Sequence, residues 1–323
     1  MATTRGHLTA EDLHGIVNAA FDGRHQLRSV ERLRGGTKKG VYRLAFEDGG
    51  TCIGYIWNDE ENYWPAPVED DSSSPFFPAS GLDLFEAAHT SLSEIGVRVP
   101  RLFLVDRSKA LVAGEVAVLE DLAGGTLEAL IEHDPVRAEP VLVQLGELIQ
   151  AMHGCRREQY GRPGRGYVRS PIERIVLERA GRDLAESAAR VDRIAAVEHH
   201  LADALRERFA AVTPRAQYSL IHGELGPDHV AVDDLDRPVL IDIEGIMFFD
   251  VEWEHVFLEL RFGEHYRHLE VEGLDTDRLR FYRLAQYLSL VAGPLRLLEG
   301  DFPDRAFMLD IVADNIRRTL GQL

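Results

Sequence analysis

Apolar positions near the start of the chain recur first with a helical period and then with a strand period. Thr9 is a candidate N-cap, and the apolar residues that follow it at helical spacing are Leu13, Ile16, Val17 and Ala20. Segments with a strand-like pattern at 29–33, 41–46 and 51–57 are separated by the polar, glycine-rich turns 34–40 and 47–50. The pattern therefore predicts one amphipathic helix followed by three strands.

Helical spacing dominates the rest of the chain. Residues 81–95 carry Leu82, Phe85 and Leu92 on one helical face, and the runs 102–105 and 116–119 predict two more strands. Further helices are predicted at 140–152, 171–188, 194–212 and over much of 258–323. The predicted strands are thus concentrated before residue 120 and the helices after it.

The stretch from Tyr218 to Glu254 places chargeable residues behind two short apolar runs, 220–221 and 239–241. The residues that follow these runs are His222, Glu224, Asp228, His229, Asp242 and Glu244. Residues 230–232 and 239–241 flank the sequence Asp-Asp-Leu-Asp, which predicts a hairpin turn. Because a hairpin brings its two ends together, we expect His229 to lie close to Asp242. A cluster of carboxylates and imidazoles suits a metal ion or a proton transfer.

This stretch resembles the catalytic segment of the aminoglycoside phosphotransferase superfamily. The pattern there is His-Gly-Asp, four residues, Asn, and then apolar-Ile-Asp after a hairpin. The chain has His222-Gly223-Glu224, four residues, His229, and Leu240-Ile241-Asp242, so that Glu and His stand where Asp and Asn are usual. The resemblance implies an α+β, bilobed protein-kinase-like fold. We expect a small antiparallel-sheet N-lobe over 1–120, which binds nucleotide, and a mainly helical C-lobe over 121–323, which carries the catalytic loop and acceptor pocket.

The turn 34–40 resembles the loop that covers the nucleotide phosphates, with Gly35 and Gly36 allowing close approach of the backbone. The third strand of the superfamily normally carries a phosphate-binding lysine, but residues 51–57 contain neither Lys nor Arg. Two of the three lysines in the chain, Lys38 and Lys39, lie in the turn instead. We predict that one of them contacts the phosphates and that only this one points inward, since neighbours alternate in extended backbone. The alternative is a nucleotide-free lobe with two solvent-facing lysines.

The resemblance implies three further residues of the nucleotide site. Glu86 takes the place of a helix acid that orients the phosphate-binding lysine, so we expect it to pair with Lys38 or Lys39. The segment that begins Glu120-Asp121-Leu122 resembles the hinge between lobes, where backbone groups recognise adenine. Glu120 and Leu122 are therefore candidate contacts for ATP, with GTP as the alternative nucleotide.

The catalytic set that we predict is Glu224, Asp242 and His222. Glu224 is the candidate carboxylate beside the acceptor hydroxyl, and since Glu and Asp have similar basicity the replacement changes reach rather than proton affinity. His222 is expected to hold the loop backbone. Asp250 falls where the superfamily has an acid that holds the catalytic loop by hydrogen bonds.

The metal set that we predict is Asp242, His229 and Glu244. Asp242 is the main ligand, because Mg²⁺ prefers oxygen donors. An imidazole at His229 suits Mn²⁺ better than Mg²⁺, and the alternative is that His229 bonds to Asp242 while Asp228 or Glu244 supplies the second oxygen.

Residues 58–80 form an acidic, serine-rich insertion that also carries Tyr63, Trp64, Phe76 and Phe77. Aromatic side chains in a loop-like segment need a surface on which to pack. We therefore expect a packed lid.

The composition of the chain limits the kinds of molecule that it is expected to bind. The net charge of −18 disfavours nucleic acid and anionic membranes, and it fits a cationic substrate as well as a merely solvated acidic surface. The chain has no apolar run near the length of a membrane-spanning helix, and its first residues lack the apolar core of a signal peptide. Two unpaired cysteines fit a reducing compartment, and we expect a cytoplasmic protein.

Three functions fit these observations. The first is an ATP-dependent phosphotransferase that modifies a hydroxyl of a small molecule, either an antibiotic or a metabolite. The second is a kinase for Ser or Thr of a peptide in a modified-peptide pathway, which the acids in the acceptor region disfavour slightly. The third is a pseudokinase that binds a partner without turnover, which the unusual Glu224 and His229 and the third strand without a lysine favour.

Overall fold

The computed structural model describes residues 5–66, 74–77 and 79–323 and forms two compact units that interleave along the sequence. The first unit comprises Met1–Ala66, Pro78–Gln144 and Asp228–Gly245. The second comprises Pro67–Phe77, Leu145–Pro227 and Ile246–Leu323. These units are defined by contacts and are not the two lobes expected from the sequence, whose boundary near residue 120 stays a prediction.

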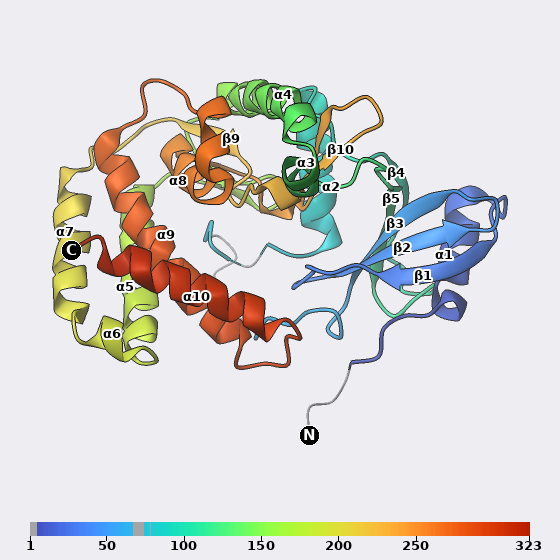
Figure 1. Ribbon diagram of the computed structural model, residues 1–323, viewed down its shortest axis with the longest axis horizontal. Coiled ribbons are helices and arrows are strands. Elements are labelled where there is room, and N and C mark those ends of the chain that lie inside the picture. The colour runs from blue at the N-terminus through green and yellow to red at the C-terminus, as the bar shows by residue number, and fades with distance from the viewer. Residues whose placement is uncertain (1–4, 67–73, 78) are drawn as a thin grey trace. The chain divides into compact units, whose positions relative to one another are not determined.

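An antiparallel sheet of five strands, counted over the described residues, dominates the first unit, in the order β1-β2-β3-β5-β4 (Figure 1). Its strands are β1 (Leu27–Arg32), β2 (Gly40–Phe46), β3 (Thr51–Trp57), β4 (Leu102–Asp106) and β5 (Glu115–Glu120). The predicted strands are thus confirmed, and their pairing is antiparallel throughout.

Helices of the first unit begin where the sequence places their caps. Thr9 caps α1 (Ala10–Phe21) by accepting the N–H of Asp12, and Thr126 caps α3 (Leu127–His133). The apolar face of α1 packs on the sheet through Leu13, Ile16 and Val17. Helix α2 (Leu82–Glu94) buries its own apolar face, including Phe85, whose ring contacts those of Tyr55 and Trp57 on β3.

The predicted hairpin is confirmed in the first unit. Strands β10 (Val230–Val232) and β11 (Pro238–Leu240) pair in antiparallel register, between the short 3-10 helices η1 (Pro227–His229) and η2 (Ile243–Gly245). Asp233 closes the turn by accepting the backbone N–H groups of Leu235 and Arg237. Helix α2 packs against η2, so that the end of the hairpin is fixed on a helix.

The second unit is mainly helical. Helix α4 (Pro135–Gly154) begins in the first unit and ends in the second. The other helices are α5 (Ile172–Ala188), α6 (Asp192–Ala195), α7 (Glu198–Ala211), α8 (Val251–Phe262), η3 (Gly263–His268), α9 (Thr276–Leu297) and α10 (Arg305–Leu320). Over the described ranges, none of the helices is both long and apolar enough to span a membrane.

A separate antiparallel sheet, in the order β6-β9-β12-β7-β8, lies in the second unit. Its strands are β6 (Arg156–Arg157), β7 (Tyr160–Arg162), β8 (Gly166–Val168), β9 (Tyr218–Ile221) and β12 (Met247–Phe249). Strand β9 leads directly into the His222-Gly223-Glu224 loop, and β12 leads into helix α8. This sheet therefore presents the candidate catalytic loop.

Candidate functional site

The two ends of the β10–β11 hairpin bring an imidazole and a carboxylate together, as the sequence predicts. The backbone N–H of Ile241 donates to the carbonyl of His229 at 3.0 Å, which fixes the register at this end. His229 Nε2 lies 3.7 Å from Asp242 Oδ2 and 3.6 Å from Asp228 Oδ2. Asp242 adopts a positive φ of 56°, a left-handed conformation that Asp tolerates better than most residues.

Lys39 from the glycine turn forms the central ion pairs of the site. Its Nζ donates to Asp242 Oδ1 at 2.5 Å and to Glu244 Oε1 at 2.5 Å. The side chains of Lys39 and Glu244 are 7% and 5% exposed, while that of Asp242 is 48% exposed. A buried ammonium thus joins two carboxylates, only one of which is open to solvent.

The charges of this cluster reinforce one another. Burial alone would lower the pKa of Lys39, but the carboxylates of Asp242 and Glu244 outweigh burial and raise this pKa above its usual value. Burial alone would raise the pKa of Asp242, but Lys39 and His229 hold it well below its usual range. The ammonium and the Asp242 carboxylate are therefore both charged at neutral pH.

The third strand takes part in this cluster although it carries no cation. The ring of Tyr55, on β3, lies 4.7 Å from Lys39 Nζ. The neighbouring Lys38 is only partly buried, and its Nζ lies 5.8 Å from the ring of Trp64. The prediction that only one of the two lysines points inward is confirmed, and it is Lys39.

The glycines of the turn are required by its backbone. Gly35 has a φ of 102°, which side chains rarely adopt. A Cβ atom on Gly36 would lie 2.3 Å from the carbonyl oxygen of Lys39. Both glycines therefore shape the segment that delivers Lys39, and their contact with phosphate stays a prediction.

The expected pairing of Glu86 with a lysine of the turn is wrong. Glu86, on α2, pairs instead with Arg107, which also bonds to Asp83 at 3.2 Å. Asp83 and Glu86 lie one helical turn apart, so a single guanidinium at the end of β4 can reach both acids. Lys39 is meanwhile held by the two carboxylates that follow the hairpin.

The hinge candidates lie where β5 ends. The N–H of Glu120 donates to the carbonyl of Arg101 at 2.9 Å, and its carboxylate accepts from Arg98 at 3.3 Å. The carbonyl of Leu122 accepts the N–H of Gly125 at 3.3 Å. Glu120 therefore fixes the strand end, and the contact of Glu120 and Leu122 with adenine stays a prediction.

The loop that carries Glu224 is held by Glu254, on α8. The Glu254 carboxylate accepts the backbone N–H groups of His222 at 2.7 Å and Gly223 at 3.3 Å. Burial would raise the pKa of Glu254, but His153 and the backbone N–H of His222 lower it, so the side chain is a buried anion. Gly223 has a φ of 91°, which lets both N–H groups turn towards one acceptor.

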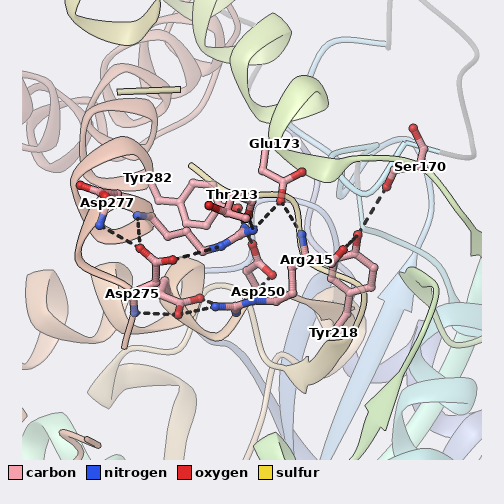
Figure 2. A network of polar contacts seen from close by, with 11 residues as sticks. Ser170, Glu173, Thr213, Arg215, Tyr218, Asp250, Asp275, Asp277 and Tyr282 are labelled. Carbon is pink, nitrogen blue, oxygen red and sulfur yellow. Dashed lines mark hydrogen bonds and ion pairs between the residues drawn. The ribbon is translucent and has the colours of Figure 1, made fainter. Parts of the chain in front are cut away.

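Asp250 was expected to hold this loop, and the structure corrects that expectation. Asp250 is fully buried and bonds to Arg278, Tyr282 and Arg215, as Figure 2 shows in part. Arg278 also donates to Glu173 at 2.6 Å, which ties α9 to α5. Burial raises the pKa of Asp250 to about 6. Asp250 is thus the centre of a structural network, and the loop is held by the acid one helical turn later.

Glu224 itself is exposed at the end of its loop and interacts electrostatically with Arg162, on β7. Burial lowers the pKa of Arg162 to about 10, although the Glu224 carboxylate opposes this shift. Arg162 donates to the carbonyls of Phe77 at 2.5 Å and Pro75 at 2.8 Å. A guanidinium that the sequence did not indicate therefore lies between the candidate base and the 58–80 insertion.

Aromatic side chains in the described parts of the insertion are packed, as expected, and the lid stays a prediction. Trp64 donates to Thr37 Oγ1 at 3.0 Å, beside the glycine turn. Phe76 packs in the second unit against the rings of Phe249 and Trp253. The acidic and serine-rich stretch 67–73 lies outside the described residues.

A metal site is not preformed in the described chain, because no group of three or more His, Cys, Asp or Glu side chains is arranged to hold a metal ion. Asp242 and Glu244 nevertheless direct one oxygen each at the same cation, the Lys39 ammonium. Mg²⁺ in kinase sites is usually held by one or two carboxylates and by substrate phosphates. The carboxylate pair therefore fits such an ion, with the phosphates as the remaining ligands.

Comparison with solved structures identifies the fold. An apo thermostable mutant of the aminoglycoside phosphotransferase APH(4)-Ia is 16% identical with a TM-score of 0.65, over 95% of this chain and 99% of that chain. Spectinomycin phosphotransferase APH(9)-Ia, in complex with ADP and spectinomycin, is 13% identical with a TM-score of 0.60, over 98% and 99%. LicA in complex with AMP is 14% identical with a TM-score of 0.62, over 98% and 100%. The protein therefore has the kinase-like fold that the sequence predicts.

The family is shown by sequence as well. The model of the phosphotransferase enzyme family, APH, matches residues 74–287, which is more than half of the chain. The chain therefore belongs to this family of enzymes. No curated protein sequence gives a significant match.

Proposed function

We propose that the protein is an ATP-dependent phosphotransferase that moves the γ-phosphate to a hydroxyl group of a small molecule. The observation that carries this proposal is the ion-pair cluster in which the buried Lys39 meets Asp242 and Glu244. Phosphoryl transfer requires a cation that contacts the phosphates and carboxylates that hold a metal ion. The lysine of the glycine turn and the two carboxylates at the end of the hairpin are groups of these kinds.

The residues of the first unit would bind the nucleotide. Asp242 and Glu244 would hold Mg²⁺, or Mn²⁺, together with the phosphates, and a bound divalent ion supplies neutralisation of the phosphate charge. Lys39 would contact the phosphates as a point charge, and the backbone at Gly35 and Gly36 would approach them closely. Glu120 and Leu122 would border the adenine of ATP, or the guanine of GTP.

The residues of the second unit would orient the acceptor. Glu224 is exposed and would accept the proton of the attacking hydroxyl. His222 contributes its backbone N–H to the bond that holds the loop. The aminoglycoside and spectinomycin phosphotransferases of similar fold support a small hydroxyl-bearing acceptor, and the net charge of −18 favours a cationic one. The free thiols of Cys52 and Cys155 support a cytoplasmic location.

Nucleotide binding tests this proposal before the acceptor is known. Calorimetric titration with a non-hydrolysable ATP analogue and with a GTP analogue, with and without Mg²⁺ or Mn²⁺, should show metal-dependent binding that Asp242→Asn abolishes. Turnover should then be detected by mass spectrometry in a panel of hydroxyl-bearing small molecules, with Ser- and Thr-containing peptides beside them. The absence of nucleotide binding would refute the proposal and favour a pseudokinase, and phosphorylation of peptides alone would favour the peptide kinase.

A further inference from the structure

We infer that Lys39 is the resident counter-ion of the Asp242–Glu244 carboxylate pair, and that a divalent metal ion binds this pair only together with nucleotide phosphates, which draw the ammonium away. The inference rests on the proposed function and adds to it an obligatory coupling between metal and nucleotide.

The first step is that the ammonium and a metal ion would use the same oxygens. Lys39 Nζ lies 2.5 Å from Asp242 Oδ1 and 2.5 Å from Glu244 Oε1. Bonds of this kind between charged groups are stronger than neutral hydrogen bonds. A metal ion that binds these oxygens must therefore break both bonds.

The second step concerns charge. Two carboxylates and one ammonium leave a net charge of about −1 in the cluster, and a divalent ion would bring two positive charges beside a third one. The Lys39 side chain is 7% exposed, so water screens this repulsion poorly. Binding of the metal ion alone is therefore opposed by the cation that is already present.

The third step is that the displaced ammonium needs new acceptors. Within the described residues, the hydrogen-bond acceptors of Lys39 are the two carboxylates, and the ring of Tyr55 is its other close polar contact. A buried ammonium without acceptors is costly. Phosphate oxygens of a nucleotide at the glycine turn supply acceptors and metal ligands at once, so that both ligands bind together favourably.

The neighbouring lysine gives a matched control. Lys38 carries the same charge on the same turn, but its Nζ lies over the ring of Trp64 and it is only partly buried. Removal of Lys38 changes the local charge without freeing Asp242 or Glu244. Any effect specific to Lys39 therefore reports on the carboxylate pair.

The test is titration of the nucleotide-free protein with Mn²⁺, following free Mn²⁺ by electron paramagnetic resonance. Lys39→Met should bind one Mn²⁺ at least about tenfold more tightly than the wild type, because removal of a like charge at close range is worth this much or more. Lys38→Met should gain clearly less affinity than Lys39→Met, because Lys38 acts on Asp242 only electrostatically and forms no bond to it. The added site should disappear in the double variants Lys39→Met/Asp242→Asn and Lys39→Met/Glu244→Gln.

Two results would overturn the inference. One is a wild-type protein that already binds Mn²⁺ without nucleotide at a site lost in Asp242→Asn, with an affinity equal to that of Lys39→Met. The other is a folded Lys39→Met variant with no gain in Mn²⁺ affinity. If Lys39→Met does not fold, Lys39→Gln keeps one donor to the carboxylates and is subject to the same expectation. The assay contains no nucleotide, so its result tests the inference whether or not the protein has the proposed activity.

Discussion

Glu254 accepts the backbone N–H of His222 at 2.7 Å and thereby ties helix α8 to the loop that carries Glu224. The same carboxylate accepts the N–H of Gly223 at 3.3 Å, and His153 Nε2 lies 3.7 Å away. Both backbone donors belong to the His-Gly-Glu motif, so the position of the candidate base depends on a buried acid.

The first prediction follows from this arrangement. Glu254→Gln keeps the size of the side chain but turns one acceptor oxygen into an NH₂ donor that faces a backbone N–H. We expect kcat for ATP turnover to fall about 10- to 100-fold, because a loop displaced by about an ångström misplaces the base. The KM for ATP should change little.

The control for the Glu254→Gln variant lies on the same helix, α8. Glu259 is exposed and pairs with Arg283, so Glu259→Gln should leave both constants unchanged. Steady-state kinetics of ATP hydrolysis measures all three proteins. Equal kcat values for Glu254→Gln and Glu259→Gln would show that the loop does not need the buried carboxylate.

The second prediction concerns the base itself. Glu224→Gln should lower kcat by about 10²–10⁴-fold, the usual contribution of general base catalysis. Glu224→Asp keeps the basicity of the side chain and shortens its reach by about an ångström. Its kcat should therefore lie between those of the wild type and Glu224→Gln. Nucleotide affinity, measured by calorimetry, should be the same in all three proteins. A Glu224→Gln variant with unchanged kcat would exclude this carboxylate as the base.

The third prediction concerns the network around Asp250. Arg278 is 1% exposed and bonds to Asp250 and Glu173, which are also buried. Arg278→Met leaves these carboxylates without their guanidinium and should lower the free energy of unfolding by about 3–5 kcal/mol. Arg283→Met, on the same helix, breaks only a surface ion pair with Glu259 and should cost less than about 1 kcal/mol. Urea denaturation measures both, and similar losses would contradict the structural role of the network.

Local features of the site were predictable from the sequence. The turn after Val232 sets the hairpin register, and the register alone places His229 near Asp242. Only one of the two lysines, Lys39, is buried, as predicted, but both lie in a bend before β2, so the extended backbone on which the prediction relied is not the reason. The strand and helix periods were sufficient for the main elements, because apolar spacing reports directly on burial.

Contacts between distant segments were not predictable in the same way. Whether Lys39 pairs with Glu86 or with Asp242 and Glu244 depends on how α2 packs against η2. This packing cannot be predicted from a local sequence pattern. Asp250 and Glu254 lie four residues apart, and only their tertiary neighbours decide which one reaches the loop.

The last prediction concerns pH. His255 is fully buried, its Nδ1 lies 2.9 Å from the Tyr266 hydroxyl, and its ring packs on that of His153. Burial, with a further contribution from His153, lowers the pKa of His255 from the usual 6.5 to about 4. Between these two values the unfolded chain binds more protons than the folded one at this position. The contribution of His255 to the free energy of unfolding should therefore be fully present above pH 6.5 and be lost as the pH falls towards 4. The loss from His255 is at most about 3 kcal/mol. Asp250, whose pKa burial raises to about 6, contributes in the opposite direction over part of the same range. Glu254, whose pKa is lowered below 4.5, adds its own loss only at lower pH.

His255→Gln keeps a polar group beside Tyr266 but cannot be protonated, so its free energy of unfolding should rise relative to that of the wild type as the pH falls from 7 to 5. The exposed His199 provides the control, since His199→Gln should keep the wild-type dependence. Urea denaturation at several pH values measures the difference, and parallel curves for wild type and His255→Gln would show that His255 does not cause the acid sensitivity.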